Sequence, residues 1–485
     1  MPREQSTRLG RRRRAEDRGS PQTSIHFRIA SAVATTLFCI AALAPTSASA
    51  APSHTQPRGY VGAASLEEAQ ALRARDLPSV VPPPRPLKQL AVSNVRDAPG
   101  LPSNGLVSNG VHLGFLPFWS QEGPRAICSA LGACPAVIGD YWNVSPNDYS
   151  FAQAGYHIDE IQRVVSGDVK AVYAPAVLFS GTMKQWTGDM TQQLVQTVKS
   201  INRRGITVWL RFCYEMNGGW MSYGLQPNDY VSVWRDVTNA VRAATNQTHM
   251  FWAPNLWNGA VDDPVQGYTP YWPGEDYVDV AGLSMYWFGP ERSINEVPDS
   301  NSFQDSLQPF YNLVTGSGSN RLGLQQGYPV IISETSAPYY FNIPSSSQYW
   351  GQEGDTDIQV PLPNMSKYTP SLNEPKPYPR SDDELAVKAT WLVQITGNST
   401  AQKFPHLTAA TWFNYLKKGN STAEVFADFR FVGGNSTVES WLRQNFGNQT
   451  AYEQGYTGAA SSIFGDLRSA SAIAPLLAIL FLACS

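Results

Sequence analysis

Two glutamates carry the chemistry that this sequence suggests. Glu215 follows a short apolar, β-rich run that starts at Thr207 and gives way to loop residues, and Glu334 closes a second such run, Pro329–Glu334. Each is predicted to lie at the carboxyl end of a buried strand. Retaining glycoside hydrolysis needs such a pair, because one carboxyl protonates the leaving oxygen while the other attacks the anomeric carbon. A lone strand-end glutamate more often caps the next helix, so the prediction depends on the pair.

The neighbours of Glu215 favour the role of proton donor. Aromatic residues surround it in the sequence: Trp209, Phe212, Tyr214, Trp220 and Tyr223. Burial among aromatic rings removes water from a carboxyl and raises its pKa toward neutrality. Glu215 is therefore predicted to act as the general acid.

The elements that must position these glutamates form a repeating pattern. Short apolar runs alternate with amphipathic stretches, which is typical of β/α units. The predicted strands are 111–118, 136–140, 171–179, 207–213, 250–254, 278–286, 329–334 and 407–414, and the predicted helices are 158–166, 190–204, 227–245, 303–314 and 382–397. Eight β/α units predict an α/β fold, the (β/α)8 TIM barrel, with its chemistry at the carboxyl ends of the strands. Glu215 then ends the fourth strand and Glu334 the seventh.

Four segments of the chain resemble glycoside hydrolase family 26, over roughly residues 111–415. They are Arg211–Trp220, Phe251–Asn255, Asp279–Tyr286 and Ile331–Glu334. That family contains β-mannanases with some β-glucanases and β-1,3-xylanases, and it belongs to a clan of retaining TIM-barrel enzymes. The resemblance implies that Glu215 is the acid/base and Glu334 the nucleophile.

The resemblance also implies roles for residues around the glutamates. Trp220, Tyr286 and Trp412 are expected to form walls of the sugar subsite. Tyr286 is expected to hydrogen-bond the nucleophile, and Arg211 to brace the carboxylates from below.

The chain departs from the family at Tyr214, where the mannanases usually have His. A phenol can donate a hydrogen bond but cannot take the charge of an imidazole. The predicted substrate is therefore either β-mannan or a related β-glucan. Asn217 and Asn255 are predicted either to contact sugar hydroxyls or to satisfy the loop backbone.

The composition agrees with a carbohydrate-binding protein. The chain has 14 Trp and 22 Tyr, only 15% charged residues and a net charge of -3, which gives no electrostatic reason to bind nucleic acid or an anionic membrane. Motifs for zinc, phosphate or serine-hydrolase chemistry are missing from the sequence, so no metal or cofactor is expected. We expect a monomer acting on a polysaccharide. A cell-wall transglycosidase and a non-catalytic carbohydrate-binding barrel are the alternatives.

The two ends of the chain predict export and anchoring. Residues 1–50 have the basic, apolar and small-residue regions of a signal peptide, with a retained signal anchor as the alternative. Residues 51–105 form a Pro/Ala-rich linker or pro-like segment that is expected to pack loosely or not at all. The catalytic barrel is assigned to residues 106–455. Residues 456–485 resemble a glycosylphosphatidylinositol (GPI) attachment signal, which predicts a cell-surface or cell-wall location.

Export fits two further features. Cys128 and Cys134 are candidates for a disulfide, whereas Cys213 is predicted to be a buried thiol. Seven glycosylation sequences predict exposed positions at Asn143, Asn246, Asn364, Asn398, Asn420, Asn435 and Asn448. The stretch 336–380 is predicted to be irregular and to overhang the cleft.

Overall fold

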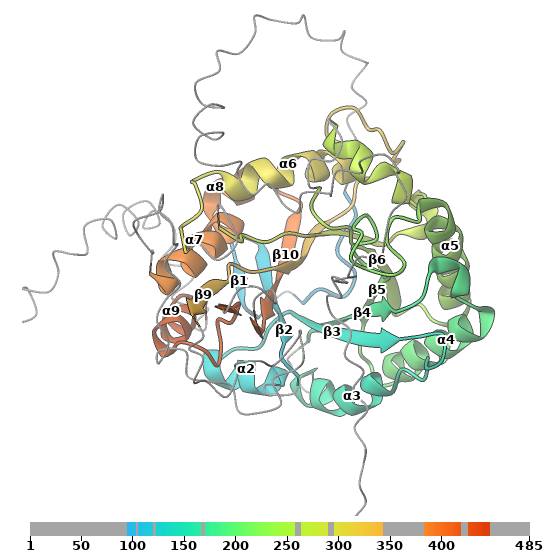
Figure 1. The fold of residues 1–485 in the computed structure, drawn as a ribbon, viewed down its shortest axis with the longest axis horizontal. Coiled ribbons are helices and arrows are strands. Elements are labelled where there is room, and N and C mark those ends of the chain that lie inside the picture. Colours follow the sequence, from blue (N-terminus) through green and yellow to red (C-terminus); the bar gives the residue numbers. More distant parts are fainter. Residues whose placement is uncertain are drawn as a thin grey trace, which may run out of the picture. The chain divides into compact units, whose positions relative to one another are not determined.

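A computed structural model describes residues 95–102, 105–119, 123–165, 170–257, 263–289, 295–342, 383–418 and 425–446. Within these residues, eight parallel strands pair in the order β2-β10-β8-β7-β6-β5-β4-β3, and a pairing of β2 with β3 closes the sheet on itself (Figure 1). The strands are β2 (Val111–Pro117), β3 (Val137–Val144), β4 (Val172–Phe179), β5 (Val208–Phe212), β6 (Thr248–Trp252), β7 (Val280–Ser284), β8 (Val330–Thr335) and β10 (Leu407–Asn414). The short β1 (Val107–Ser108) pairs antiparallel with β2. The predicted (β/α)8 barrel is confirmed.

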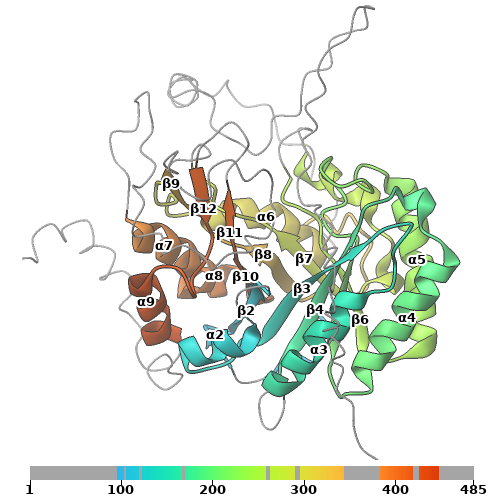
Figure 2. The ribbon, with the colours of Figure 1, turned by 60° about the horizontal axis from the view of Figure 1, so that its bottom comes forward.

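Helices surround the barrel (Figures 1 and 2). They are α2 (Pro124–Leu131), α3 (Ala152–Val165), α4 (Gly188–Asn202), α5 (Pro227–Ala244), α6 (Ser302–Thr315), α7 (Glu384–Thr396), α8 (Asn398–Lys403) and α9 (Ser436–Phe446), with 3-10 turns at Met183–Gln185, Pro264–Gly267, Thr269–Tyr271 and Glu275–Tyr277. Helix α5 shows why the chain folds this way. Its residues Tyr230, Trp234, Val237 and Val241 recur at helical spacing and are all buried, so one face of the helix packs on the barrel.

A small antiparallel sheet was not predicted from the sequence. It has the order β11-β12-β9 and consists of β9 (Tyr339–Asn342), β11 (Leu416–Lys418) and β12 (Val425–Asp428). It follows the carboxyl ends of β8 and β10, on the same side of the barrel as Glu334 (Figure 2). The stretch 336–380 therefore begins with a paired strand rather than an irregular segment, and residues 343–382 lie outside the described part of the chain.

Residues 95–102 correct the prediction that the segment before the barrel packs loosely. Val95 pairs with Gly327, ahead of β8, and Arg96 Nη2 donates to Glu275 Oε1 at 2.7 Å. The Pro99 carbonyl accepts a hydrogen bond from Trp209 Nε1 at 2.7 Å. These partners lie near the amino ends of the strands, so this segment covers the end of the barrel opposite the glutamates. The rest of 51–105 up to residue 94, the predicted signal peptide and the predicted anchor signal lie outside the described residues.

Cys128 and Cys134 form a disulfide that ties the end of α2 to the following turn. Cys213 is buried and free, and burial raises its pKa well above the ordinary value, so this thiol stays protonated.

The glycosylation candidates differ in exposure. Asn246 and Asn398 are exposed, as predicted, whereas Asn143 and Asn435 are half-buried. The Asn143 Oδ1 atom, on β3, is buried without a hydrogen-bond partner in the described part of the chain. Asn435 Nδ2 donates to Glu384 Oε2 at 2.9 Å, so the prediction of a free, exposed amide is wrong there. Asn364, Asn420 and Asn448 lie outside the described residues.

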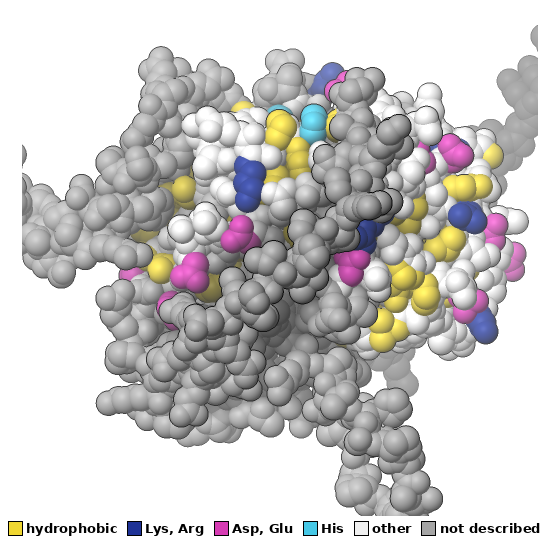
Figure 3. Space-filling model, turned by 90° about the horizontal axis from the view of Figure 1, so that it is seen from above, with side chains coloured by type: hydrophobic (Ala, Val, Ile, Leu, Met, Phe, Trp, Pro, Cys, Tyr) yellow, Lys and Arg dark blue, Asp and Glu magenta, His cyan; other side chains and the backbone are white. Residues whose placement is uncertain are grey.

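The described surface carries charges of both signs. On the face in Figure 3, Lys and Arg side chains are dispersed among Asp and Glu side chains and hydrophobic patches. This agrees with the small net charge of the chain. Within the described residues, no helix combines the length and the apolar character that crossing a bilayer requires.

Candidate active site

The loop after β5 turns sharply to present Glu215. Cys213 has φ 45° and Glu215 has φ 53°, both in the left-handed region that non-glycine residues seldom adopt. Such conformations cost on the order of 1–3 kcal/mol each and persist where the surroundings hold them. Here the Glu215 amide donates to the Ala253 carbonyl at 2.8 Å, which fixes the loop to the end of β6.

The Glu215 carboxyl is buried among polar partners. Its Oε2 accepts a hydrogen bond from Trp220 Nε1 at 2.8 Å. Burial raises the pKa of Glu215 to about 7, and the negative charge of Glu334 adds to this rise, while Asn255, Arg211 and Ser284 oppose it. A carboxyl with this pKa is about half protonated at pH 7, so it can serve as a proton donor there.

Glu334, on β8, is held by two hydrogen bonds. Its Oε1 accepts from Arg211 Nη1 at 2.8 Å, and its Oε2 accepts from the Tyr286 hydroxyl at 2.8 Å. Both Glu334 and Arg211 are almost completely buried. Hydrogen bonds to the charged form stabilise it, and they also fix the orientation of the side chain.

The two glutamates share one site at the carboxyl ends of β5 and β8. Glu334 lies near enough for its charge to raise the pKa of Glu215. Ser284, at the end of β7, connects the two glutamates' partners. It hydrogen-bonds Glu215, and its Oγ lies 3.4 Å from Nη2 of Arg211, which binds Glu334. A carboxyl with a raised pKa beside a second carboxyl fixed by an arginine and a tyrosine is an arrangement suited to glycoside hydrolysis by two carboxyl groups.

Residues 145–348 match the family model for Glycosyl hydrolase family 26. This part of the chain is similar to family 26. The resemblance predicted from the sequence motifs is confirmed.

Two mannosidases match parts of the chain. Mannan endo-1,4-beta-mannosidase A and B of Caldalkalibacillus mannanilyticus is 27% identical over 114 residues, which is 21% of this chain and 21% of that protein. Mannan endo-1,4-beta-mannosidase of Bacillus subtilis is 26% identical over 106 residues, or 21% of this chain and 29% of that protein. The chain thus spans less than a third of the length of either relative.

Solved structures of family 26 mannanases match over more of the chain. The catalytic domain of the endo-beta-1,4-mannanase of Bacillus sp. JAMB-750 is 15% identical, with a TM-score of 0.42, covering 72% of this chain and 90% of that chain. A modular endo-beta-1,4-mannanase of Cellulomonas fimi is 14% identical, with a TM-score of 0.43, covering 69% of this chain and 70% of that chain.

Tyr214 lies close to both glutamates. It is buried, its ring faces the Arg211 guanidinium at 4.6 Å, and it packs on Tyr141 at 5.7 Å. Burial raises the pKa of Tyr214 well above its ordinary value, and the charges of Glu334 and Glu215 act in the same direction. Tyr214 is therefore a neutral ring that contacts a cation, at the position where a His would bring a titratable group.

The two asparagines have different environments. Asn217 Nδ2 donates to the Asn255 carbonyl and Asn217 Oδ1 accepts from the Asn255 amide, both at 2.8 Å. Asn217 thus satisfies loop backbone, which is one of its two predicted roles. The Asn255 side chain hydrogen-bonds Glu215 instead.

Trp412 corrects the prediction of a sugar-subsite wall. It has 0% exposed surface, its Nε1 donates to the Phe429 carbonyl at 2.8 Å, and its ring packs on Phe431 at 4.3 Å. A side chain without exposed surface belongs to the core. Trp220 and Tyr286, the other predicted walls, are half-buried and each touches one of the glutamates.

Tyr141 and Tyr415 join the site without having been predicted. Both are half-buried, and their rings lie 6.3 Å apart. Burial raises the pKa of Tyr141 well above its ordinary value, and the charge of Glu334 contributes, so Tyr141 lies close to the carboxylates. The predicted strand ended at Asp140, whereas β3 continues to Val144. Continuing the alternation of that strand would have placed Tyr141 at the site.

Proposed function

We propose that this protein is a retaining endo-β-glycosidase acting on β-mannan or a related β-glucan. The observation that supports it most is the pairing of a buried Glu215, whose pKa is raised to about 7, with a hydrogen-bonded Glu334 in one site. The family 26 match over residues 145–348 supports the same reading.

The reaction proceeds by double displacement. Glu334 attacks the anomeric carbon, and the bond from that carbon to the leaving oxygen breaks as Glu215 gives the oxygen its proton. Glu215, now a carboxylate, takes a proton from an incoming water. The water oxygen bonds to the anomeric carbon and Glu334 leaves, which restores both groups.

The substrate class rests on the relatives and on the aromatic residues. The two curated relatives are named mannan endo-1,4-beta-mannosidases. Half-buried Trp220, Tyr141, Tyr286 and Tyr415 present flat apolar surfaces that suit sugar rings. A related β-glucan is the alternative substrate, because Tyr214 replaces the His that the mannanases usually have.

The test is a panel of β-mannan, mixed-linkage β-glucan and β-1,3-glucan, with product analysis. We expect new reducing ends on β-mannan or mixed-linkage β-glucan, and loss of activity in Glu334→Ala and Glu215→Gln. Azide should rescue Glu334→Ala on an activated aryl glycoside, giving a glycosyl azide of inverted configuration. Longer products would indicate the transglycosidase, and binding without cleavage would indicate a non-catalytic barrel and overturn the proposal.

We further propose that the enzyme is exported and held at the cell surface by a GPI anchor. The signal-like residues 1–50, the tail 456–485 and the Cys128–Cys134 disulfide support this location. Release of the full chain from expressing eukaryotic cells by phosphatidylinositol-specific phospholipase C is the expected result. Retention in the cytosol would overturn it.

A further inference from the structure

Tyr286, which holds the nucleophile, is enclosed by aromatic rings. It stacks on Phe288 with ring centroids 5.2 Å apart, and it meets the edges of Phe413 and Phe429 at 5.9 and 6.1 Å. Its hydroxyl donates to Glu334 Oε2 at 2.8 Å. Because the ring is rigid, the packing around it sets where that hydroxyl lies.

Phe429 enters this enclosure from the end of the small antiparallel sheet. It directly follows β12, and its carbonyl accepts hydrogen bonds from Ser336 Oγ at 2.9 Å and Trp412 Nε1 at 2.8 Å. Its amide donates to the Tyr415 carbonyl at 2.9 Å. Ser336 is two residues beyond Glu334, so the Phe429 backbone is attached to the chain that carries the nucleophile.

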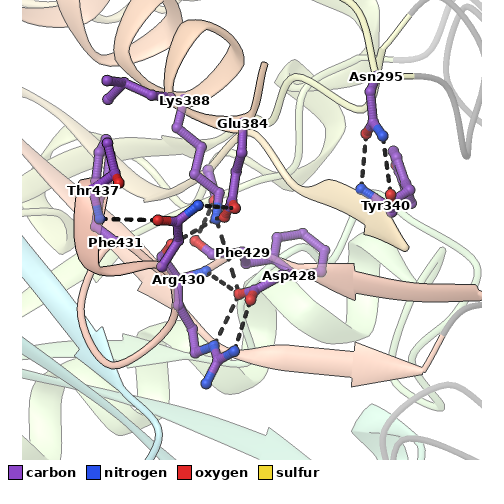
Figure 4. Close-up of polar contacts among 12 residues, drawn as sticks. Asn295, Tyr340, Glu384, Lys388, Asp428, Phe429, Arg430, Phe431 and Thr437 are labelled. Atoms are coloured by element: carbon purple, nitrogen blue, oxygen red, sulfur yellow. Dashed lines mark hydrogen bonds and ion pairs between the residues drawn. The ribbon is translucent and has the colours of Figure 1, made fainter. Parts of the chain in front are cut away.

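The residues on either side of Phe429 are fixed by buried charges (Figure 4). Arg430 donates through Nε and Nη2 to the two carboxylate oxygens of Asp428, at 2.9 and 2.7 Å. Lys388, on α7, donates to the Arg430 carbonyl and to Glu384 Oε1, each at 2.6 Å. We name these four residues, Glu384, Lys388, Asp428 and Arg430, the ionic cluster.

Stability alone gives a weak reason for the ionic cluster. Asp428, Lys388 and Arg430 are 0% exposed and Glu384 is 5% exposed. Well-packed apolar residues often stabilise a core as well as a buried ion pair does, because the charges lose their hydration. Burial alone would raise the pKa of Asp428, but the charges of Arg430 and Lys388 outweigh it and lower the pKa, so the Asp428 carboxyl stays ionised. Its directional bonds fix the chain at both neighbours of Phe429.

We propose that the ionic cluster and Phe429 are positioning residues for the nucleophile: the cluster fixes Phe429, whose ring holds the Tyr286 hydroxyl against Glu334. This inference rests on the proposed function for its kinetic consequence. Its geometric consequence can be measured whether or not the protein cleaves a glycan.

The first test compares two phenylalanines of the same segment. Phe429→Leu removes the ring that meets Tyr286 but keeps the backbone carbonyl. Phe431→Leu is the matched control, because Phe431 is 0% exposed and packs on Trp412 and Trp441 instead. In crystal structures, we expect the distance from the Tyr286 hydroxyl to Glu334 to exceed about 3.5 Å in Phe429→Leu only. An intact bond in Phe429→Leu would overturn the proposal.

The second test is a double-mutant cycle on a cleaved substrate. Phe429→Leu should lower kcat about 10-fold to 100-fold with KM changed less than about 3-fold, because misplacement of a reacting group affects the chemical step. In a Tyr286→Phe background, Phe429→Leu should have almost no further effect, since the hydroxyl is already absent. If the reductions in kcat caused by Phe429→Leu and Tyr286→Phe multiply in the double variant, Phe429 acts by another route and the proposal is overturned. If the unmutated protein cleaves no glycan, the proposed function fails, and the crystal structures still decide this inference.

The ionic cluster is tested through Arg430→Lys. This substitution keeps the net charge of the cluster but removes the paired hydrogen bonds from the guanidinium to the two oxygens of Asp428. We expect a fall in kcat smaller than that of Phe429→Leu and no fall in the Tyr286→Phe background. An unchanged kcat together with an unmoved Phe429 would remove the cluster from the proposal. Should this variant not fold, Lys388→Arg, which keeps the charge on α7, serves the same comparison.

Discussion

Arg211 and Glu334 form a buried ion pair, with Nη1 and Oε1 2.8 Å apart and side chains 1% and 5% exposed. The pair joins β5 to β8 at the level of the reacting groups. Arg211 also lies over the ring of Tyr214, so it links Glu334 to Tyr214. Removal of either charge leaves the other without its main partner.

Arg211→Met is expected to lower the free energy of unfolding by about 3–5 kcal/mol, because it leaves a buried carboxylate unpaired. Denaturant unfolding monitored by Trp fluorescence measures the change. Arg96→Met is the control, since its ion pair with Glu275 has the same kind of groups at 2.7 Å but is 28% and 17% exposed. For that pair we expect about 0–1 kcal/mol. Equal losses in the two variants would contradict this account.

The pH dependence of catalysis is expected to follow Glu215. Because the acid must be protonated and its pKa is about 7, kcat/KM should fall as pH rises through about 7. Trp220→Phe removes the indole N–H that stabilises the charged form of this carboxyl, so the falling limb should move to higher pH. A pH profile on an unactivated polysaccharide measures both. A limb that stays in place in Trp220→Phe would contradict the role of this hydrogen bond.

The free energy of unfolding should also depend on pH through Glu215. The folded pKa of Glu215 is raised from 4.5 to about 7, so between these values the folded state holds more protons than the unfolded state. The contribution of Glu215 to the free energy of unfolding is therefore fully present below pH 4.5. It is lost as pH rises to about 7, which lowers the free energy of unfolding by roughly 3 kcal/mol. Glu215→Gln removes the titration, so its stability relative to the unmutated protein should rise over this range. A constant difference between the two proteins would exclude the raised pKa.

The strands and the two glutamates could be predicted because both depend on local sequence. Apolar β-rich runs such as 329–334 mark a buried strand wherever its partners lie, and the glutamate that ends each run reaches the carboxyl edge by topology alone. The observed β8, Val330–Thr335, differs from its prediction by one residue at each end.

The remaining features depend on contacts between distant segments. Tyr339–Asn342 is a strand because it pairs with Val425–Asp428, and four residues do not reveal that partner. Trp412 is buried because Phe429 and Phe431, from beyond β10, cover it. Lys388 lies in a helix, where a lysine usually indicates a solvent-facing position. Its burial is explained by Glu384, the Arg430 carbonyl and Asp428, which come from distant parts of the chain except for Glu384.

Residues 95–102 should contribute to stability although they precede the barrel. A chain that starts at residue 103 loses the Val95–Gly327 pairing, the Arg96–Glu275 ion pair and the bond from Trp209 to the Pro99 carbonyl. The Trp209 N–H is then left without this acceptor, and we expect a loss of about 2–4 kcal/mol in the free energy of unfolding. A chain that starts at residue 95 is the control and should keep the stability of the one that starts at 51. Thermal unfolding compares the three, and equal midpoints would show that this segment adds nothing.

Tyr214→His tests whether this position sets the sugar preference. At the new imidazole, burial and the positive charge of Arg211 favour the neutral ring, whereas the charges of Glu334 and Glu215 favour the cation. In either state the ring brings a new hydrogen-bonding nitrogen to the site. We expect the ratio of kcat/KM on β-mannan to that on mixed-linkage β-glucan to rise about tenfold, equivalent to about 1.4 kcal/mol at the transition state. Tyr214→Phe separates the effect of the new nitrogen from that of losing the hydroxyl, because it keeps the ring over Arg211. If both variants change the two substrates by the same factor, Tyr214 supports the carboxylates without selecting the sugar.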